Sequence, residues 1–364
     1  MRLTQQAVTP VTVAIVVLAL AATTALASPA RSTAQVMSAP IKVVATIPVG
    51  VSPYGVAANP AKKTIYVANS FFNTVSVISA RTDTVTATIR VGQSPHGVAA
   101  DPRTKTIYVA NQFSDTVSVI SARTNTVTAT IPVGELPFGV AADPRTKTIY
   151  VANFLSDTVS VISARTNTVV ATIRLGRCEC SQPVDLPFWV AVNPRTNTVY
   201  VTNQGSDHLS VSVINARTNK AVARIRLPFT PEGIAVNPRT NTAYVVTDHN
   251  LLSVINGKTN KVVTTITAGS NAPGDNAFGV AADPRTGLIY VTNPDSNTVT
   301  VINGETRKKV ATVRVGRSPF IGIAVNPRTG LVYVANLFSN TVSVLASCRK
   351  KEAASRSAVH CRRS

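Results

Sequence analysis

Apolar and polar positions along the chain alternate in short runs, and the runs recur in sets of four. Residues 116–121 (Thr-Val-Ser-Val-Ile-Ser) show the two-residue period of a strand with one buried face. Residues 107–110 (Ile-Tyr-Val-Ala) are apolar without alternation, as in a strand buried on both faces. Further runs at 97–100 and 126–133 complete the set, and turn residues separate them. Helical periodicity is absent, so the pattern predicts an all-β protein built from units of four short strands, here called A to D.

The unit at residues 97–134 returns almost unchanged at 139–176, with looser copies before and after. Its second strand carries a Tyr-Val-x-Asn motif, whose tyrosines are Tyr66, Tyr108, Tyr150, Tyr200, Tyr290 and Tyr333, with a degraded copy (Tyr-Val-Val-Thr) at Tyr244. The spacings of 42, 42, 50, 44, 46 and 43 residues are typical of β-propeller blades. We therefore expect a seven-bladed β-propeller of four-stranded antiparallel blades over residues 41–346. An open β-solenoid is the alternative, although its repeats are usually shorter, and the degraded copy leaves the regularity of the fifth blade open.

Closure of the ring can be predicted from the two ends of the repeat array. The last unit supplies strands A, B and C only and ends near residue 346, where a basic tail follows. Residues 42–50, before the first unit, match strand D of other units, for example 170–176. We predict that the N-terminal strand, 41–49, completes the seventh blade, because this arrangement removes an unpaired sheet edge.

The repeated segments resemble a known family. Tyr-Val-Ala-Asn and Tyr-Val-Thr-Asn, with Gly-Val-Ala before them and Thr-Val-Ser-Val-Ile after them, are similar to the YVTN-family β-propeller repeat over residues 41–346. The resemblance implies an exported seven-bladed binding scaffold of the surface-layer or periplasmic type. It carries no catalytic residue and no cofactor over to this chain.

The N-terminal segment has the features of an export signal. Residues 1–27 contain an apolar core at 11–22 and a small-x-small cleavage site at 25–27, which together predict a signal peptide. An uncleaved anchor is the alternative, but the apolar run is shorter than the ~20 residues of a spanning helix. Residues 28–40 form a predicted linker and 347–364 a basic C-terminal tail. We expect a secreted, periplasmic or cell-surface protein with no membrane span in the mature chain.

Four cysteines in an exported chain favour disulfides, with three possible pairings. Cys178 and Cys180 lie in an insertion, 177–185, in a D–A loop, whereas Cys348 and Cys361 flank the C-terminal tail. The insertion and Cys348 belong to opposite rims of a propeller, so the local pairs Cys178–Cys180 and Cys348–Cys361 are favoured. The first would close a very tight ring. A metal-binding Cys-x-Cys is the alternative, but no His cluster accompanies it and we expect no metal.

Charge is concentrated in two kinds of turn. The formal net charge is +20, and A–B and C–D turns, which share one rim of a propeller, carry many of the basic residues. The candidates for contact with a polyanion are Arg103, Arg145, Arg195, Arg239, Arg285, Arg328, Arg123 and Arg165. The possible partners are single-stranded DNA and acidic polymers. Duplicated, solvated turn residues, some paired with a nearby Asp, are the alternative. Base-specific recognition is not expected, because these turns lack the aromatics that stack on bases.

The opposite rim carries the D–A and B–C loops, and the D–A loops repeat a Pro-aromatic-Gly pattern. Strand A is innermost, so we expect these side chains to surround the mouth of the channel and bind a ligand there. The candidates are Tyr54, His96, Phe138, Phe188, Trp189, Glu232, Phe278 and Phe320. Aromatics that the B–C loops add are Phe72, Phe113, Phe154 and Phe338. Packing between blades is the alternative role.

Catalysis requires titratable groups that converge. The mouth offers only His96 and Glu232, with His208 in a nearby loop, and the chain has no phosphate loop, nucleophile elbow or zinc spacing. We therefore expect a non-catalytic, monomeric binding module of the cell envelope or extracellular space. The alternatives are a polyanion-binding protein and a propeller hydrolase or lyase around His96, His208 and Glu232.

Overall fold

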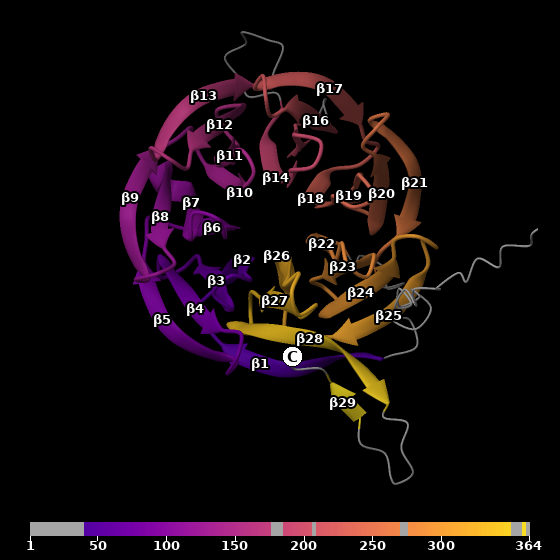
Figure 1. Cartoon of the computed structure of the whole chain (residues 1–364). Helices are drawn as coiled ribbons and strands as arrows, with labels where there is room; N and C mark the ends of the chain where they lie inside the picture. Colours follow the sequence, from indigo (N-terminus) through magenta and orange to yellow (C-terminus); the bar gives the residue numbers. More distant parts are fainter. Residues whose placement is uncertain (1–39, 176–184, 206–208, 270–275, 351–358, 362–364) are drawn as a thin grey trace, which may run out of the picture. The chain divides into compact units, whose positions relative to one another are not determined.

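The computed structural model describes residues 40–175, 185–205, 209–269, 276–350 and 359–361. They form seven antiparallel sheets around a common centre (Figure 1). The innermost strands of successive blades contact one another in a closed cycle, from β2 through to β26 and back to β2. The predicted seven-bladed β-propeller is therefore confirmed.

Each blade runs outward from strand A to strand D. The A strands are β2 (Pro53–Asn59), β6 (Pro95–Asp101), β10 (Pro137–Asp143), β14 (Pro187–Asn193), β18 (Pro231–Asn237), β22 (Val280–Ala282) and β26 (Pro319–Val325). The B strands are β3 (Thr64–Asn69), β7 (Thr106–Asn111), β11 (Thr148–Asn153), β15 (Thr198–Asn203), β19 (Thr242–Thr247), β23 (Leu288–Asn293) and β27 (Val332–Asn336). The C strands are β4 (Thr74–Ser79), β8 (Thr116–Ser121), β12 (Thr158–Ser163), β16 (Ser210–Asn215), β20 (Leu251–Asn256), β24 (Thr298–Asn303) and β28 (Thr341–Lys350). The D strands are β5 (Thr84–Arg90), β9 (Thr126–Pro132), β13 (Thr168–Arg174), β17 (Lys220–Arg226), β21 (Lys261–Thr267), β25 (Lys309–Arg314) and, from the other end of the chain, β1 (Ile41–Pro48). A short 3-10 helix, η1 (Gln112–Ser114), lies in one B–C loop.

The ring is closed by the N-terminal strand. The seventh sheet has the order β1-β28-β27-β26, and Figure 1 shows indigo β1 beside yellow β28. Ile47 pairs with Val342 in this register, and Val49 N–H donates to Asn340 O at 2.9 Å. The predicted completion of the last blade from the N-terminus is confirmed.

The C-terminal boundary lies later than the predicted residue 346. β28 continues to Lys350, and a further strand, β29 (Val359–Cys361), pairs with it antiparallel. Part of the segment expected to be only a basic tail is thus a strand pair, because β28 offers backbone groups beyond β1 for pairing. The expected signal peptide, 1–27, and residues 28–39 of the expected linker lie outside the described residues.

The tyrosine of the repeat motif packs between blades. Tyr108 of β7 belongs to the same buried cluster as Val140 and Ile149 of the next blade and is fully buried. Its counterparts Tyr66 and Tyr150 make equivalent contacts one blade earlier and later. Burying a large side chain of this kind contributes on the order of 2 kcal/mol, so the repeated tyrosine stabilises the stacking of neighbouring blades.

The asparagine of the motif ties strand B to strand C. Asn111 Nδ2 donates to Thr116 Oγ1 at 3.0 Å and to Ser118 Oγ at 2.9 Å. The glycine that follows the preceding strand D lies directly against it: a Cβ on Gly92 would be 2.7 Å from Asn111 Cγ. The glycine after strand D therefore recurs together with the Tyr-Val-x-Asn motif of the next unit, because the glycine packs directly on the motif asparagine.

The fifth blade is regular despite its degraded motif. β18 to β21 form a four-stranded sheet, and Tyr244 is 3% exposed like its counterparts. Thr247 stands in place of the asparagine, and Leu227-Pro228 after the preceding strand D stands in place of the usual Val-Gly. The sheet is maintained by its backbone ladder and buried apolar residues, so the missing motif asparagine does not remove the blade.

Candidate functional site

Backbone hydrogen bonds divide the loops between two rims. Ser70 N–H in a B–C loop donates to Ser52 O in a D–A loop at 3.0 Å, which defines the mouth rim. Ala80 N–H in a C–D turn donates to Lys63 O in an A–B turn at 2.8 Å, which defines the arginine rim. The two surfaces expected from the sequence are therefore at opposite ends of the blades.

Aromatic rings at the start of strand A form a continuous series, here called the aromatic girdle. It runs through blades 6, 7, 1, 2, 3 and 4. Centroids of neighbouring rings are 4.1 Å apart for Phe278–Phe320, 5.5 Å for Phe320–Tyr54, 4.1 Å for Tyr54–His96, 5.1 Å for His96–Phe138 and 5.0 Å for Phe138–Phe188. The edge-to-face and tilted arrangements are those that aromatic pairs favour. The rings thus pack against each other across blade boundaries and also line one end of the inner strands.

Trp189 differs from the other predicted mouth residues because it occupies the glycine position of the Pro-aromatic-Gly pattern. In blade 2 that glycine permits close approach of the next blade, since a Cβ on Gly97 would lie 2.3 Å from Phe138 O. The Trp189 ring is 6.0 Å from Phe188 and packs on the core between blades 4 and 5. Trp189 is therefore largely a packing residue at the edge of the girdle.

Glu232 takes the girdle position in blade 5. Gln204 Nε2 donates to Glu232 Oε2 at 2.8 Å, and Thr202 Oγ1 donates to the Glu232 carbonyl at 3.0 Å. Burial raises the pKa of Glu232 to about 7, the Gln204 bond opposes the rise, and the charge of Asp248 adds to it. The pKa of Tyr54 is raised by burial and by the Glu232 charge, so this carboxyl acts electrostatically on a girdle residue of blade 1. The carboxyl of Glu232 can thus exchange a proton near neutral pH.

His96 is 7% exposed and lies between two girdle rings. Its Nδ1 is 2.9 Å from Ser94 O, which assigns the proton to Nδ1. Burial lowers the pKa of His96 to about 4, and the bond to Ser94 opposes this shift only in part. His96 is therefore a neutral packing and hydrogen-bonding residue at physiological pH.

The B–C loop aromatics divide into two groups. Phe154 turns inward, with its ring 5.4 Å from Phe138 and 6.4 Å from Phe188. The others project outward with exposed fractions of 60% for Phe72, 64% for Phe113 and 65% for Phe338. These three rings make no contact with the girdle rings among the described residues, and Phe72 packs instead on the exposed ring of Phe71 at 5.2 Å.

The exposed side chains form a second apolar feature on the mouth rim, here called the phenylalanine arc. It covers blades 7, 1, 2 and 3, which are consecutive around the ring (Figure 1). Its members are Phe338, Phe71, Phe72, Phe113 and Leu155. The corresponding positions of blades 4, 5 and 6 hold Gly205, His249 and Asp295. The sequence signal for the arc was the residue two after each motif asparagine, which is large and apolar in only one part of the ring.

All eight predicted arginines of the arginine rim are exposed. The nearby aspartate is used by the turn backbone, since Asp101 Oδ1 accepts the N–H of Arg103 at 2.9 Å. Arg145 Nη1 donates to Pro194 O at 2.8 Å, and Arg285 Nη1 to Arg328 O at 3.4 Å. Within the described part of the chain none of the eight forms an ion pair with a carboxylate, so their charge is available to solvent.

Comparison with known proteins places this fold in a family. The sequence profile of the YNCE-like beta-propeller matches residues 28–132 and 100–346. The chain belongs to the YNCE-like beta-propeller family. Among solved structures it is similar to a chain of hydrazine synthase from Kuenenia stuttgartiensis, with 23% identity and a TM-score of 0.71 over 80% of this chain and 95% of that one. At this identity the likeness shows the fold alone. No curated protein matched the chain.

The finer resemblance to YVTN repeats of the surface-layer type stays a prediction. As a propeller, the YNCE-like chain is a binding or interaction scaffold in general terms. In the described residues no helix is long and apolar enough to cross a membrane.

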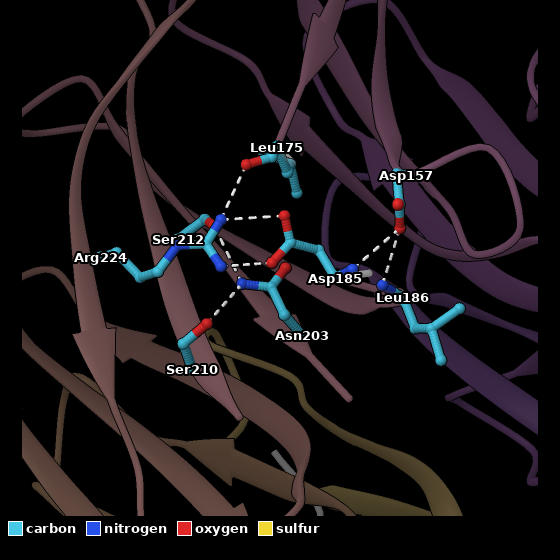
Figure 2. Close-up of polar contacts among 8 residues, drawn as sticks. All are labelled: Asp157, Leu175, Asp185, Leu186, Asn203, Ser210, Ser212 and Arg224. Carbon is cyan, nitrogen blue, oxygen red and sulfur yellow. Dashed lines mark hydrogen bonds and ion pairs between the residues drawn. The ribbon is translucent and has the colours of Figure 1, made fainter. Parts of the chain in front are cut away.

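The YNCE-like propeller also contains an ion pair that was not predicted from the sequence (Figure 2). Arg224 of β17 forms a two-fold ion pair with Asp185, which is 1% exposed, and donates through Nη2 to Leu175 O at 2.7 Å. Asp157 Oδ1 accepts the N–H groups of Asp185 and Leu186 at 3.1 and 2.9 Å. The end of the insertion is thus anchored between blades 3 and 4. The signal was present, because Arg224 stands where the other D strands carry threonine.

The predicted cysteine pairs and His208 are only partly described by the structure. Cys178 and Cys180 lie outside the described residues, as does His208. Cys348 is buried and disulfide-bonded, and Cys361 is its partner in the backbone register of β28 and β29. The register places the two backbones as a local Cys348–Cys361 pairing requires, and the full connectivity stays a prediction.

Proposed function

We propose that this protein is an exported, non-catalytic binding module whose partner docks on the mouth rim. The observation that carries the proposal is the phenylalanine arc, in which Phe72, Phe113 and Phe338 are each at least 60% exposed on neighbouring blades. Soluble proteins rarely expose grouped large apolar side chains unless another molecule covers them. The aromatic girdle lies on the same rim as the arc, at the starts of the inner strands.

The girdle supplies the polar selectivity that an apolar surface lacks. Glu232, held by Gln204, is its one carboxyl group, and Tyr54 presents a hydroxyl whose proton is held tightly by burial. Binding sites commonly combine apolar walls with a few fixed polar groups in this way. A partner with an exposed apolar segment next to a hydrogen-bonding group fits the surface best.

The test is co-sedimentation of the purified chain with isolated cell envelopes, with a triple variant F72S/F113S/F338S beside it. Loss of three exposed phenylalanines should lower the bound fraction at least ten-fold, because each would bury most of its ring against a partner. The binding should persist at 0.5 M salt, since it rests on apolar contact.

A matched control changes apolar residues elsewhere on the surface. Val85, Val127 and Val222 are exposed on D strands, with exposed fractions of 36%, 37% and 58%. The variant V85T/V127T/V222T should bind as the natural sequence does. Equal loss in both triple variants, or binding that the phenylalanine changes leave intact, would remove the mouth rim from consideration.

A second candidate function is binding of an anionic polymer through the arginine rim. It is favoured by the exposure of all eight arginines and by the use of the neighbouring aspartates within the turns. Backbone attraction of this type is independent of sequence and weakens steeply with salt, by a logarithmic slope of about 0.7 for each neutralised phosphate of a single strand.

This candidate is tested with single-stranded DNA and an acidic polysaccharide over a salt series. The variant R103S/R145S/R195S/R239S removes four charges, so the salt slope for DNA should fall by up to about 3 if each contacts a phosphate. An unchanged slope would mean that these arginines are solvated residues of the turns and do not contact the polymer.

Export and the absence of catalysis are parts of the same proposal. Export is supported by the signal-like residues 1–27, and mass spectrometry of the protein from each cell fraction would show whether the chain begins at residue 28. The non-catalytic role is supported by the state of His96, which is neutral and bonded to Ser94. Turnover in a lactone and ester screen that is abolished by H96A would instead establish a hydrolase or lyase.

A further inference from the structure

A cavity of about 480 Å³ opens on the arginine rim between blades 5 and 6. Its walls come from the A–B turns of both blades and the C–D turn of blade 6, so it is separate from the aromatic girdle. Arg239, Arg285 and Arg307 line it with exposed side chains, and Glu305 is the one carboxylate among the lining residues. Three arginines against one glutamate leave a positive excess at this opening.

The C–D turn of blade 6 departs from that of the preceding blades. Arg307 occupies the left-handed position, with φ of 60°, where blades 1 to 5 carry Asp or Asn. Glu305 stands where those blades carry Arg or Lys. Burial raises the pKa of Tyr244, whereas Thr242 and the Arg307 guanidinium act in the opposite direction. The exchange of residues in this turn therefore moves a positive charge toward the cavity tyrosine.

The boundary between blades 5 and 6 also lacks a bridge found elsewhere. Arg145 and Arg285 each reach a backbone carbonyl of the following blade, Pro194 O and Arg328 O. The counterpart in blade 5 is Arg239, whose side chain makes no hydrogen bond or ion pair within the described part of the chain. Arg239 lines the cavity instead of bridging to a carbonyl of the following blade.

The buried lining residues carry amide and hydroxyl groups. Asn237 is 2% exposed, and its Oδ1 accepts the N–H of Arg239 at 3.0 Å, while its NH₂ group has no partner among the described residues. Tyr244, 3% exposed, and Thr242 add hydroxyls, and Val254 adds a small apolar wall. Hydroxyls and amides beneath a cationic opening match a ligand with several hydroxyls and one acidic group.

We propose that this cavity binds a small acidic carbohydrate, either a sugar phosphate or a sugar carboxylate. Its volume lies within the range of about 300 to 1,000 Å³ that is usual for small-molecule sites. The planar guanidinium forks of Arg239 and Arg307 can each pair with a phosphate or carboxylate through two hydrogen bonds. The site is separate from the mouth rim, so this proposal can be tested independently of the docking function proposed above.

The test is isothermal titration of the full chain with glucose 6-phosphate and with glucuronate. Glucose and inorganic phosphate serve as references for the two halves of the ligand. An acidic sugar should bind at least ten-fold more tightly than either reference. R307N and R239S should each weaken this binding at least ten-fold, and stronger binding of one acidic sugar identifies the acidic group.

The controls remove the same charge from equivalent turns of blade 2. R123N and R103S should change the affinity less than two-fold. R307N restores the residue type of the other blades, so its thermal midpoint should match that of the natural sequence and a loss of binding is not a loss of fold. Equal weakening by the blade 2 variants, an unaffected R307N, or binding no tighter than inorganic phosphate would overturn the proposal.

Discussion

Ionisation of Glu232 should make the stability of the propeller depend on pH in a defined direction. The folded-state pKa is about 7, against an ordinary value of 4.5 that applies to the unfolded chain. Because the folded state holds this proton more tightly, its stabilising contribution is fully present below pH 4.5 and is lost as the pH rises through 7. A shift between those two values corresponds to about 3 kcal/mol in total.

The variant E232Q isolates this effect, because glutamine has nearly the same shape as glutamate but does not ionise. Its side-chain oxygen can still accept the hydrogen bond from Gln204. Urea unfolding followed by Trp189 fluorescence should show E232Q gaining about 3 kcal/mol relative to the natural sequence between pH 4.5 and 8.5. His96 has a lowered pKa of about 4, so its own contribution is lost as the pH falls from 6.5. That loss is common to both proteins and cancels in the difference.

The control for this experiment is E135Q, which removes an exposed carboxylate from a D–A loop of the same rim. If the stability difference between E232Q and the natural sequence stays constant over the pH range, Glu232 is solvated and not buried against the girdle. A difference of the opposite sign would mean that the ionised carboxylate is stabilised by the fold, which would refute the reasoning.

Three further predictions concern the architecture. R224T leaves Asp185 buried and unpaired and should cost about 3 kcal/mol in urea unfolding, whereas R226T at the exposed end of the same strand should be nearly neutral. G97V places a side chain 2.3 Å from Phe138 O and should lower the thermal midpoint by several degrees or prevent folding, which circular dichroism would show; a midpoint equal to that of the natural sequence would contradict the close approach of blades 2 and 3. A chain that begins at residue 51 lacks β1 and leaves the edge of β28 unpaired, so it should aggregate or dimerise in light scattering, and a stable monomer would contradict closure by β1.

Much of the architecture could be predicted because a propeller repeats local rules. The number of blades follows from the four apolar runs in each unit and the turn residues between them. The closure follows from the ends of the array, where the first segment supplies an extra strand D and the last unit lacks one, since an unpaired strand edge is unfavourable. The division into a mouth rim and an arginine rim follows from strand order alone. The same logic placed the girdle residues at the starts of the A strands.

Only the tertiary structure decided which residues make contact between blades and how single blades depart from the repeat. Whether Phe154 turns inward while Phe113 projects outward depends on the rings of Phe138 and Phe188 nearby, which no pattern within one unit records. The ion pair of Asp185 and Arg224 joins the loop between blades 3 and 4 to the outer strand of blade 4. The cavity beside Arg239 and Arg307 depends on how the turns of blades 5 and 6 meet. A repeat specifies what every blade shares, whereas burial and packing across a boundary depend on the two particular blades that meet there.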